Sequence, residues 1–217
     1  MNPKFFEYER DNGQRFTLVI PGPYDSSISV PLIIVLHYGY AGRMPTPFYG
    51  RELLQGVVEP AWQELGAIMA APDCQHANWA NPKSEAAVLE LIRHLQKEYQ
   101  IAADKIVLTG YSLSGMGTWY LAARNQQVFA AAVPMAGSPQ PDSADVDWQI
   151  PLYILHGQQD ELIPFEQTTE LVAKLQARQV EITLELLDGV THYEKCRFMR
   201  PLRNILPWLQ EKLGIEK

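Results

Sequence analysis

Short apolar runs alternate along this chain with longer stretches of helical periodicity. The clearest run, LIIVL at residues 32–36, is continuously apolar, as expected of a strand buried on both faces. Weaker runs of the same type predict further strands at residues 16–20, 67–71, 105–109, 130–135, 151–155 and 181–187. Helices are predicted between them at residues 51–65, 83–99, 116–124, 165–178 and 202–213, with Asn81 and Pro82 starting the second and Pro207 bending the last. This alternation favours an α/β fold with a mostly parallel central sheet and helices on both faces.

Length and charge exclude several classes of protein. The 217 residues suit a single domain over residues 1–217. A net charge of −7 argues against nucleic acid as a partner, because phosphate binding needs a basic face. The chain lacks the run of about 18 apolar residues that a membrane helix needs, so no membrane partner is expected. Its first residues do not resemble a secretory signal, which predicts a cytoplasmic protein.

A candidate nucleophile follows the strand predicted at residues 105–109. The sequence GYSLSGMGTW at residues 110–119 is nearly the Gly-x-Ser-x-Gly elbow, a strand-to-helix turn that exposes a serine at its apex. The positions two before and two after that serine must be small. Ser112 has Gly110 and Ser114 there, whereas Ser114 as nucleophile would have Ser112 and the bulky Met116. Ser112 is therefore the better candidate.

A serine nucleophile needs a general base and a third group that orients the base. Asp160 follows the strand predicted at residues 151–155, and His192 follows the next one, which gives the order serine, acid, histidine. We expect Asp160 to orient His192, and His192 to accept the Ser112 proton. Glu161 and Asp188 are the rival acids, although Asp188 lies close to His192 in the chain. His37 and His156 each end a strand and are interpreted as structural.

Two backbone N–H groups are needed to stabilise an oxyanion. One is predicted at Leu113, directly after the nucleophile, and the other at Tyr38, Gly39 or Tyr40, in the loop after residues 32–36. Trp79, Tyr111 and Tyr193 lie beside the predicted catalytic loops and are candidates for substrate binding. Only residues 43–58 could form a small cap, so an open site is expected. Histidine spacing suited to metal binding is absent, and we predict neither a metal nor a cofactor.

These residues together resemble the α/β-hydrolase superfamily, above all its small lid-poor serine esterases. The similar groups are the carboxylesterase/phospholipase group, dienelactone hydrolase-like proteins, and the polyhydroxybutyrate depolymerase and feruloyl esterase-like group. The resemblance implies an α/β-hydrolase fold with little or no lid, and a triad of Ser112, Asp160 and His192. Two departures are Ser114 in place of an elbow glycine and Tyr38 inserted before the loop glycine. Dienelactone hydrolases proper use cysteine as nucleophile, so their narrower activity is not expected here.

The function predicted on this basis is hydrolysis of small to medium carboxylic esters or thioesters through an acyl-enzyme. A serine peptidase of the same fold is one alternative, although such enzymes usually carry a gating domain. A non-catalytic binding module with a hydrolase fold is the other alternative, and the intact Ser112, Asp160 and His192 argue against it.

Overall fold

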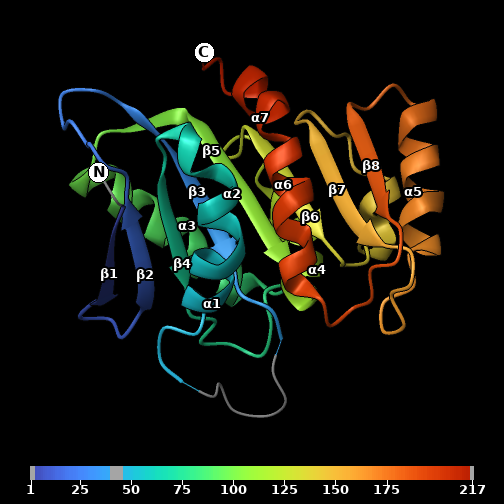
Figure 1. Cartoon of the computed structure of the whole chain (residues 1–217), viewed down its shortest axis with the longest axis horizontal. Helices are drawn as coiled ribbons and strands as arrows, with labels where there is room; N and C mark the ends of the chain where they lie inside the picture. Colours follow the sequence, from blue (N-terminus) through green and yellow to red (C-terminus); the bar gives the residue numbers. More distant parts are fainter. Residues whose placement is uncertain (1–2, 40–45, 216–217) are drawn as a thin grey trace.

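An eight-stranded sheet forms the centre of the protein in a computed structural model that describes residues 3–39 and 46–215 (Figure 1). The strand order is β1-β2-β4-β3-β5-β6-β7-β8, and all strands from β4 to β8 in that order run parallel. The first two strands pair antiparallel at one edge. The strands are β1 (Lys4–Glu9), β2 (Arg15–Ile20), β3 (Val30–Leu36), β4 (Ile68–Pro72), β5 (Ile101–Tyr111), β6 (Ala131–Met135), β7 (Leu152–Gly157) and β8 (Ile182–Leu187). The predicted α/β class and mostly parallel sheet are confirmed.

Each central strand contributes to two separate hydrophobic cores, one on each face of the sheet. In β3, Leu32, Ile34 and Leu36 lie in one core, and Ile33 and Val35 lie in the other. All five are fully buried. Successive side chains of a strand point to opposite faces, so a strand covered on both sides must be apolar at every position. This is the physical reason for the unbroken apolar run.

Helices cover both faces (Figure 1). One face is covered by α3 (Pro82–Glu98), α4 (Leu113–Arg124) and α5 (Glu166–Ala177). The other is covered by α1 (Arg51–Leu53), α2 (Glu59–Trp62), α6 (Met199–Asn204) and α7 (Leu206–Lys212). Asn81 caps α3 as predicted, because its side-chain oxygen accepts the N–H groups of Lys83 and Ser84. The last helix breaks at Ile205, two residues before Pro207, as predicted.

The segment at residues 51–65 differs from its prediction. Instead of one helix it forms α1, a π-helical turn η1 (Leu54–Val58), α2 and a 3-10 turn η2 (Gln63–Leu65). Pro60 cannot donate a backbone hydrogen bond and its ring crowds the carbonyl four residues earlier, so a regular α-helix cannot run through this position. The buried side chains of η1, Leu54, Val57 and Val58, pack in the core against the sheet. The described part of the predicted cap therefore covers the sheet face.

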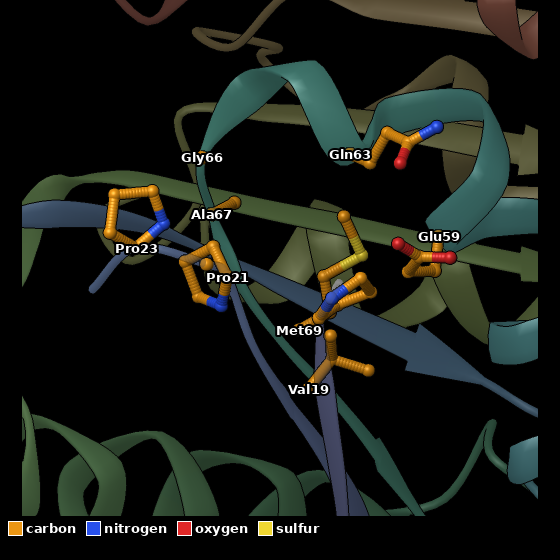
Figure 2. A pocket seen from close by; sticks show the side chains of 10 residues that line it. Val19, Pro21, Pro23, Glu59, Gln63, Gly66, Ala67 and Met69 are labelled. Carbon is orange, nitrogen blue, oxygen red and sulfur yellow. The ribbon is translucent and has the colours of Figure 1, made fainter. Parts of the chain in front are cut away.

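A small cavity of about 190 Å³ lies at the edge of the sheet where β2 ends and β4 begins (Figure 2). Its walls include Pro21 and Pro23 after β2, and Met69 of β4. Glu59 of α2 also lines it, and in the described part of the chain its buried Oε1 atom has no hydrogen-bond partner. Burial raises the pKa of the Glu59 carboxyl. The cavity therefore lies on the side of the sheet opposite the carboxyl ends of the parallel strands.

Within residues 3–39 and 46–215, no helix has the length and apolar character needed to cross a bilayer.

Candidate active site

The turn between β5 and α4 places Ser112 at a strained apex. Its backbone angles, φ 63° and ψ −122°, are ones that side-chain-bearing residues rarely adopt. A Cβ added to Gly110 would lie 2.6 Å from the carbonyl oxygen of Ser114, so only glycine fits two residues before the apex. This is the strand-turn-helix context that the elbow requires.

Ser114 is fully buried in the first turn of α4. Its Oγ accepts the backbone N–H of Tyr111 at 2.7 Å and lies 2.8 Å from the carbonyl oxygen of Leu36, the last residue of β3. The small serine therefore fits where the resembling families have glycine. Its hydroxyl contacts the main chain of two neighbouring strands, β5 and β3, whereas the hydroxyl of Ser112 faces a histidine.

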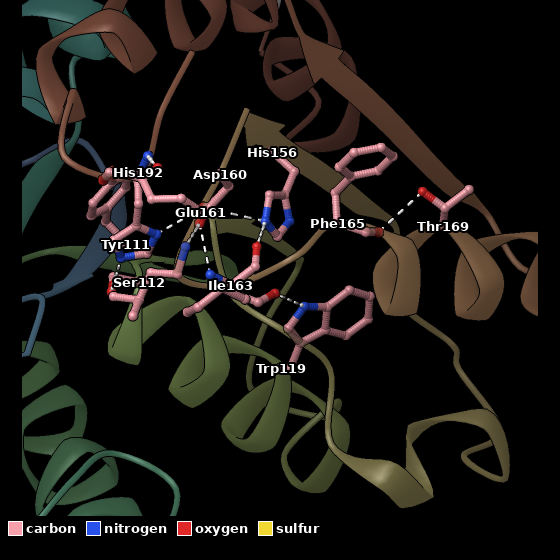
Figure 3. Close-up of polar contacts among 12 residues, drawn as sticks. Tyr111, Ser112, Trp119, His156, Asp160, Glu161, Ile163, Phe165, Thr169 and His192 are labelled. Carbon is pink, nitrogen blue, oxygen red and sulfur yellow. Dashed lines mark hydrogen bonds and ion pairs between the residues drawn. The ribbon is translucent and has the colours of Figure 1, made fainter. Parts of the chain in front are cut away.

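Three polar side chains meet at the carboxyl ends of β5, β7 and β8 (Figure 3). Ser112 Oγ lies 2.7 Å from His192 Nε2, and His192 Nδ1 lies 2.8 Å from Asp160 Oδ2. The other carboxylate oxygen of Asp160 accepts the backbone N–H groups of Leu162, at 3.0 Å, and Ile163, at 2.7 Å. When Nδ1 keeps its proton and donates it in a hydrogen bond to the carboxylate, the Nε2 lone pair points at the serine hydroxyl. That arrangement suits proton abstraction.

The main chain of His192 is bound on both sides. Its N–H donates to Glu161 Oε2 at 3.0 Å, and its carbonyl accepts the hydroxyl of Tyr111. Glu161, a rival for the role of acid, thus contacts the histidine's backbone, while Asp160 contacts its ring. The other rival, Asp188, is exposed in the turn after β8.

The predicted oxyanion donors lie next to one another. Leu113 is the first residue of α4, so its N–H has no acceptor within the helix. A Cβ added to Gly39 would lie 3.2 Å from Leu113 Cβ, which shows how closely the loop after β3 approaches the elbow. Tyr38 also lies in this loop. Tyr40, the third candidate for the second donor, lies outside the described residues.

His37 anchors the loop after β3, as its structural interpretation predicts. Its Nδ1 atom donates to the carbonyl of Tyr38 at 2.8 Å, and its Nε2 atom accepts the N–H of Cys74 at 2.9 Å. Burial lowers the pKa of His37, in keeping with a neutral ring that donates once and accepts once. Trp79 donates its indole N–H to the backbone carbonyl of His37 at 2.9 Å.

A cavity of about 750 Å³ opens above Ser112, and its walls are mainly apolar. Predicted site residues in its lining are Tyr38, Gly39, Tyr111, Ser112, Leu113, His192 and Tyr193. Trp79 is absent from this lining and is buried, so we leave it out of the proposed substrate site. Sequence reasoning missed Met116, Leu162, Ile163 and Lys195. Each lies within four residues of a predicted triad residue in the sequence, and this proximity could have identified them as candidates for the cavity lining.

Tyr38 connects three segments at the rim of this cavity. Its hydroxyl donates to Glu52 of α1 and accepts a hydrogen bond from the Lys195 ammonium, and Lys195 also contacts Glu52 at 3.2 Å. Burial, followed by the bond to Glu52, raises the pKa of Tyr38 to about 12, so the phenol stays protonated at neutral pH. The loop predicted to carry the second oxyanion donor is thereby joined to the loop that carries His192.

Among the described residues, no group of three or more His, Cys, Asp and Glu side chains could hold a metal ion.

Comparison with known proteins relates this architecture to esterases. The sequence pattern of the dienelactone hydrolase family matches residues 36–200. A probable feruloyl esterase C from Aspergillus terreus is 27% identical over 172 residues, covering 75% of this chain. A bifunctional acetylxylan esterase/xylanase from Neocallimastix patriciarum is 22% identical over 169 residues, covering 74% of it. The crystal structure of a thermostable esterase superposes with a TM-score of 0.79 over 96% of this chain, at 24% identity.

These three proteins are longer than the matched region. The chain spans 61% of the Aspergillus esterase, 24% of the bifunctional enzyme and 62% of the thermostable esterase. The structural likeness, at that identity, concerns the α/β-hydrolase fold.

Proposed function

Because the chain belongs to the dienelactone hydrolase family, we propose that it is a serine hydrolase that cleaves carboxylic esters or thioesters of small to medium size. The observation that carries this proposal is the contact series from Ser112 Oγ to His192 Nε2, 2.7 Å, and from His192 Nδ1 to Asp160 Oδ2, 2.8 Å. The esterase names of its relatives support the same reaction class. The serine at position 112 separates it from the cysteine-dependent activity after which the family is named.

The first half-reaction forms an acyl-enzyme. Ser112 Oγ attacks the ester carbonyl carbon while its proton passes to His192 Nε2. Negative charge develops on the carbonyl oxygen, where the N–H of Leu113 and a donor from the loop of Tyr38 and Gly39 stabilise it. The tetrahedral intermediate collapses, and His192 returns the proton to the departing alcohol or thiol.

The second half-reaction regenerates the enzyme. A water molecule loses a proton to His192 Nε2 and attacks the acyl carbon, and the collapse of this intermediate returns the proton to Ser112 Oγ as the acid leaves. Asp160 stays ionised throughout and stabilises the imidazolium. The apolar walls formed by Leu113, Met116 and Leu162 suit an uncharged acyl or alcohol group.

Labelling with a fluorophosphonate probe tests this proposal, with Ser112→Ala and Ser114→Ala as a matched pair. We expect wild type and Ser114→Ala to be labelled and Ser112→Ala to remain unlabelled. Hydrolysis of acyl nitrophenyl esters should fall by several orders of magnitude in Ser112→Ala and His192→Ala, and somewhat less in Asp160→Asn.

Three results would contradict the proposal. Labelling of Ser112→Ala would place the nucleophile elsewhere. An unlabelled wild type would favour a binding module, and faster cleavage of aminoacyl amides than of esters would favour a peptidase. The single-domain organisation and the cytoplasmic location stay predictions.

A further inference from the structure

A second histidine lies against the proposed acid. His156 is in β7, its side chain is completely buried, and its Nε2 atom lies 2.8 Å from the carbonyl oxygen of Ile163 and 3.5 Å from Asp160 Oδ2 (Figure 3). A carbonyl oxygen can only accept a hydrogen bond, so Nε2 carries the proton. In the described part of the chain the buried Nδ1 atom has no hydrogen-bond partner. The polar contacts of this ring therefore all run through its Nε2–H group.

His156, Ile163 and Asp160 contact one another in a closed set of three interactions. Ile163 donates its N–H to Asp160 Oδ1 at 2.7 Å, and its carbonyl accepts from His156. The same Oδ2 atom of Asp160 faces two histidines, His192 at 2.8 Å and His156 at 3.5 Å. The backbone of the loop that carries the acid is thus bound at Ile163 to both Asp160 and His156.

His156 acts here as a neutral group. Burial lowers its pKa, although the carbonyl of Ile163 and the charge of Asp160 oppose this effect. Its N–H presents the positive end of a dipole to the carboxylate without forming a competing ion pair. An apolar side chain could fill the same volume, but it would leave the carbonyl of Ile163 without this donor.

We propose that His156 is a positioning residue that holds the Asp160 carboxylate against His192 through its bond to Ile163. The proposal rests on the function proposed above, since it assigns His156 no contact with substrate. Its effect on the rate must pass through Asp160, and this makes it separable from a general contribution to folding.

A double-mutant cycle tests this dependence. His156→Leu in the wild-type background should lower kcat for a nitrophenyl ester roughly ten- to a hundredfold, as losing the partner that orients a site residue does elsewhere, with KM changed by less than about twofold. In an Asp160→Ala background, the same substitution should change kcat by less than about twofold, because there is no carboxylate left to position.

Two amide variants provide the conservative comparison. His156→Gln places an amide nitrogen where Nε2 stood, within reach of the carbonyl of Ile163, and should recover most of the rate. His156→Asn places its amide near the Nδ1 position, away from that carbonyl, and should resemble His156→Leu. Melting temperatures of all variants show whether each is folded. The Gln and Asn pair decides the matter even if the Leu variant does not fold.

The inference is overturned if His156→Leu costs the same factor with and without Asp160, if it costs nothing, or if Gln is no better than Asn. Full activity of Asp160→Ala would instead remove the proposed triad itself. A strongly impaired Asp160→Ala combined with a fully active His156→Leu would overturn the role of His156 alone.

Discussion

Ser114 stands where the usual elbow has glycine, and it forms structural hydrogen bonds there. Its buried hydroxyl satisfies the N–H of Tyr111 and reaches the carbonyl of Leu36. Ser114→Ala leaves a buried N–H without this acceptor and should lower the free energy of unfolding by about 1–3 kcal/mol. Chemical denaturation measures this loss, and ester hydrolysis below the melting temperature should continue. A variant as stable as wild type would show that the hydroxyl contributes nothing at this site.

The hydroxyl of Tyr111 allows a separate test of how His192 is positioned. Tyr111→Phe removes the hydroxyl that donates to the backbone carbonyl of His192 while it keeps the ring in the cavity wall. One hydrogen bond contributes about 1 kcal/mol, so kcat should fall about fivefold. Tyr193→Phe is the matched control, because Tyr193 is 74% exposed beside the same histidine. An equal loss in both variants would argue against positioning by Tyr111.

At the scale of elements, α4 is held close to the loop that carries Trp79. A Cβ added to Gly117 would lie 2.2 Å from Trp79 Cβ, whereas one added to Gly56 in η1 would meet nothing within 4 Å. Gly117→Ala should therefore destabilise the protein by about 1–3 kcal/mol through overpacking. Gly56→Ala should be neutral or stabilising by up to about 1 kcal/mol. Thermal unfolding of the pair checks this contrast, which would fail if both changes had the same sign.

The contacts among Tyr38, Glu52 and Lys195 join three segments but should contribute little to overall stability. The side chains of Lys195 and Glu52 are 31% and 56% exposed, so solvent weakens the attraction between them. We expect Lys195→Met to change the free energy of unfolding by less than about 1 kcal/mol. It should also lower kcat, because its partner Tyr38 lies in the loop predicted to supply an oxyanion donor. Urea titration and ester kinetics separate the two effects. Lys105→Met is the control, since Lys105 does not line the cavity and its ammonium donates to the carbonyl of Gly214 at 3.3 Å.

For the molecule as a whole, the buried carboxyl of Glu59 predicts how stability depends on pH. Burial raises its folded-state pKa above the ordinary value of 4.5, so the folded protein holds this proton more tightly than the unfolded chain. Stability must then fall as pH rises from the unfolded-state pKa through the higher folded-state pKa. Glu59→Gln should melt at a higher temperature than wild type at pH 7, and the gap should narrow toward pH 4. A pH-independent gap for Glu59→Gln would contradict this explanation.

Local periodicity and order along the chain were enough to predict the strands from residue 16 onward and the α/β class. The order of the elements also predicted that Ser112, Asp160 and His192 lie together, because each follows a strand and the carboxyl ends of parallel strands lie on one side of the sheet. The edge strand β1 was missed: its sequence KFFEYE is mostly exposed and lacks a buried apolar run.

The sequence by itself therefore determined the fold class and the chemical candidates, since both depend on patterns within a few residues. Only the tertiary structure shows which of Asp160 and Glu161 contacts the ring of His192, because the two are adjacent in the chain and identical in charge. Their different contacts with His192, ring against backbone, arise from the turn after β7, and its geometry depends on His156 and Ile163. Likewise, the burial of Trp79 depends on how closely α4 packs, a distance that no spacing along the chain encodes.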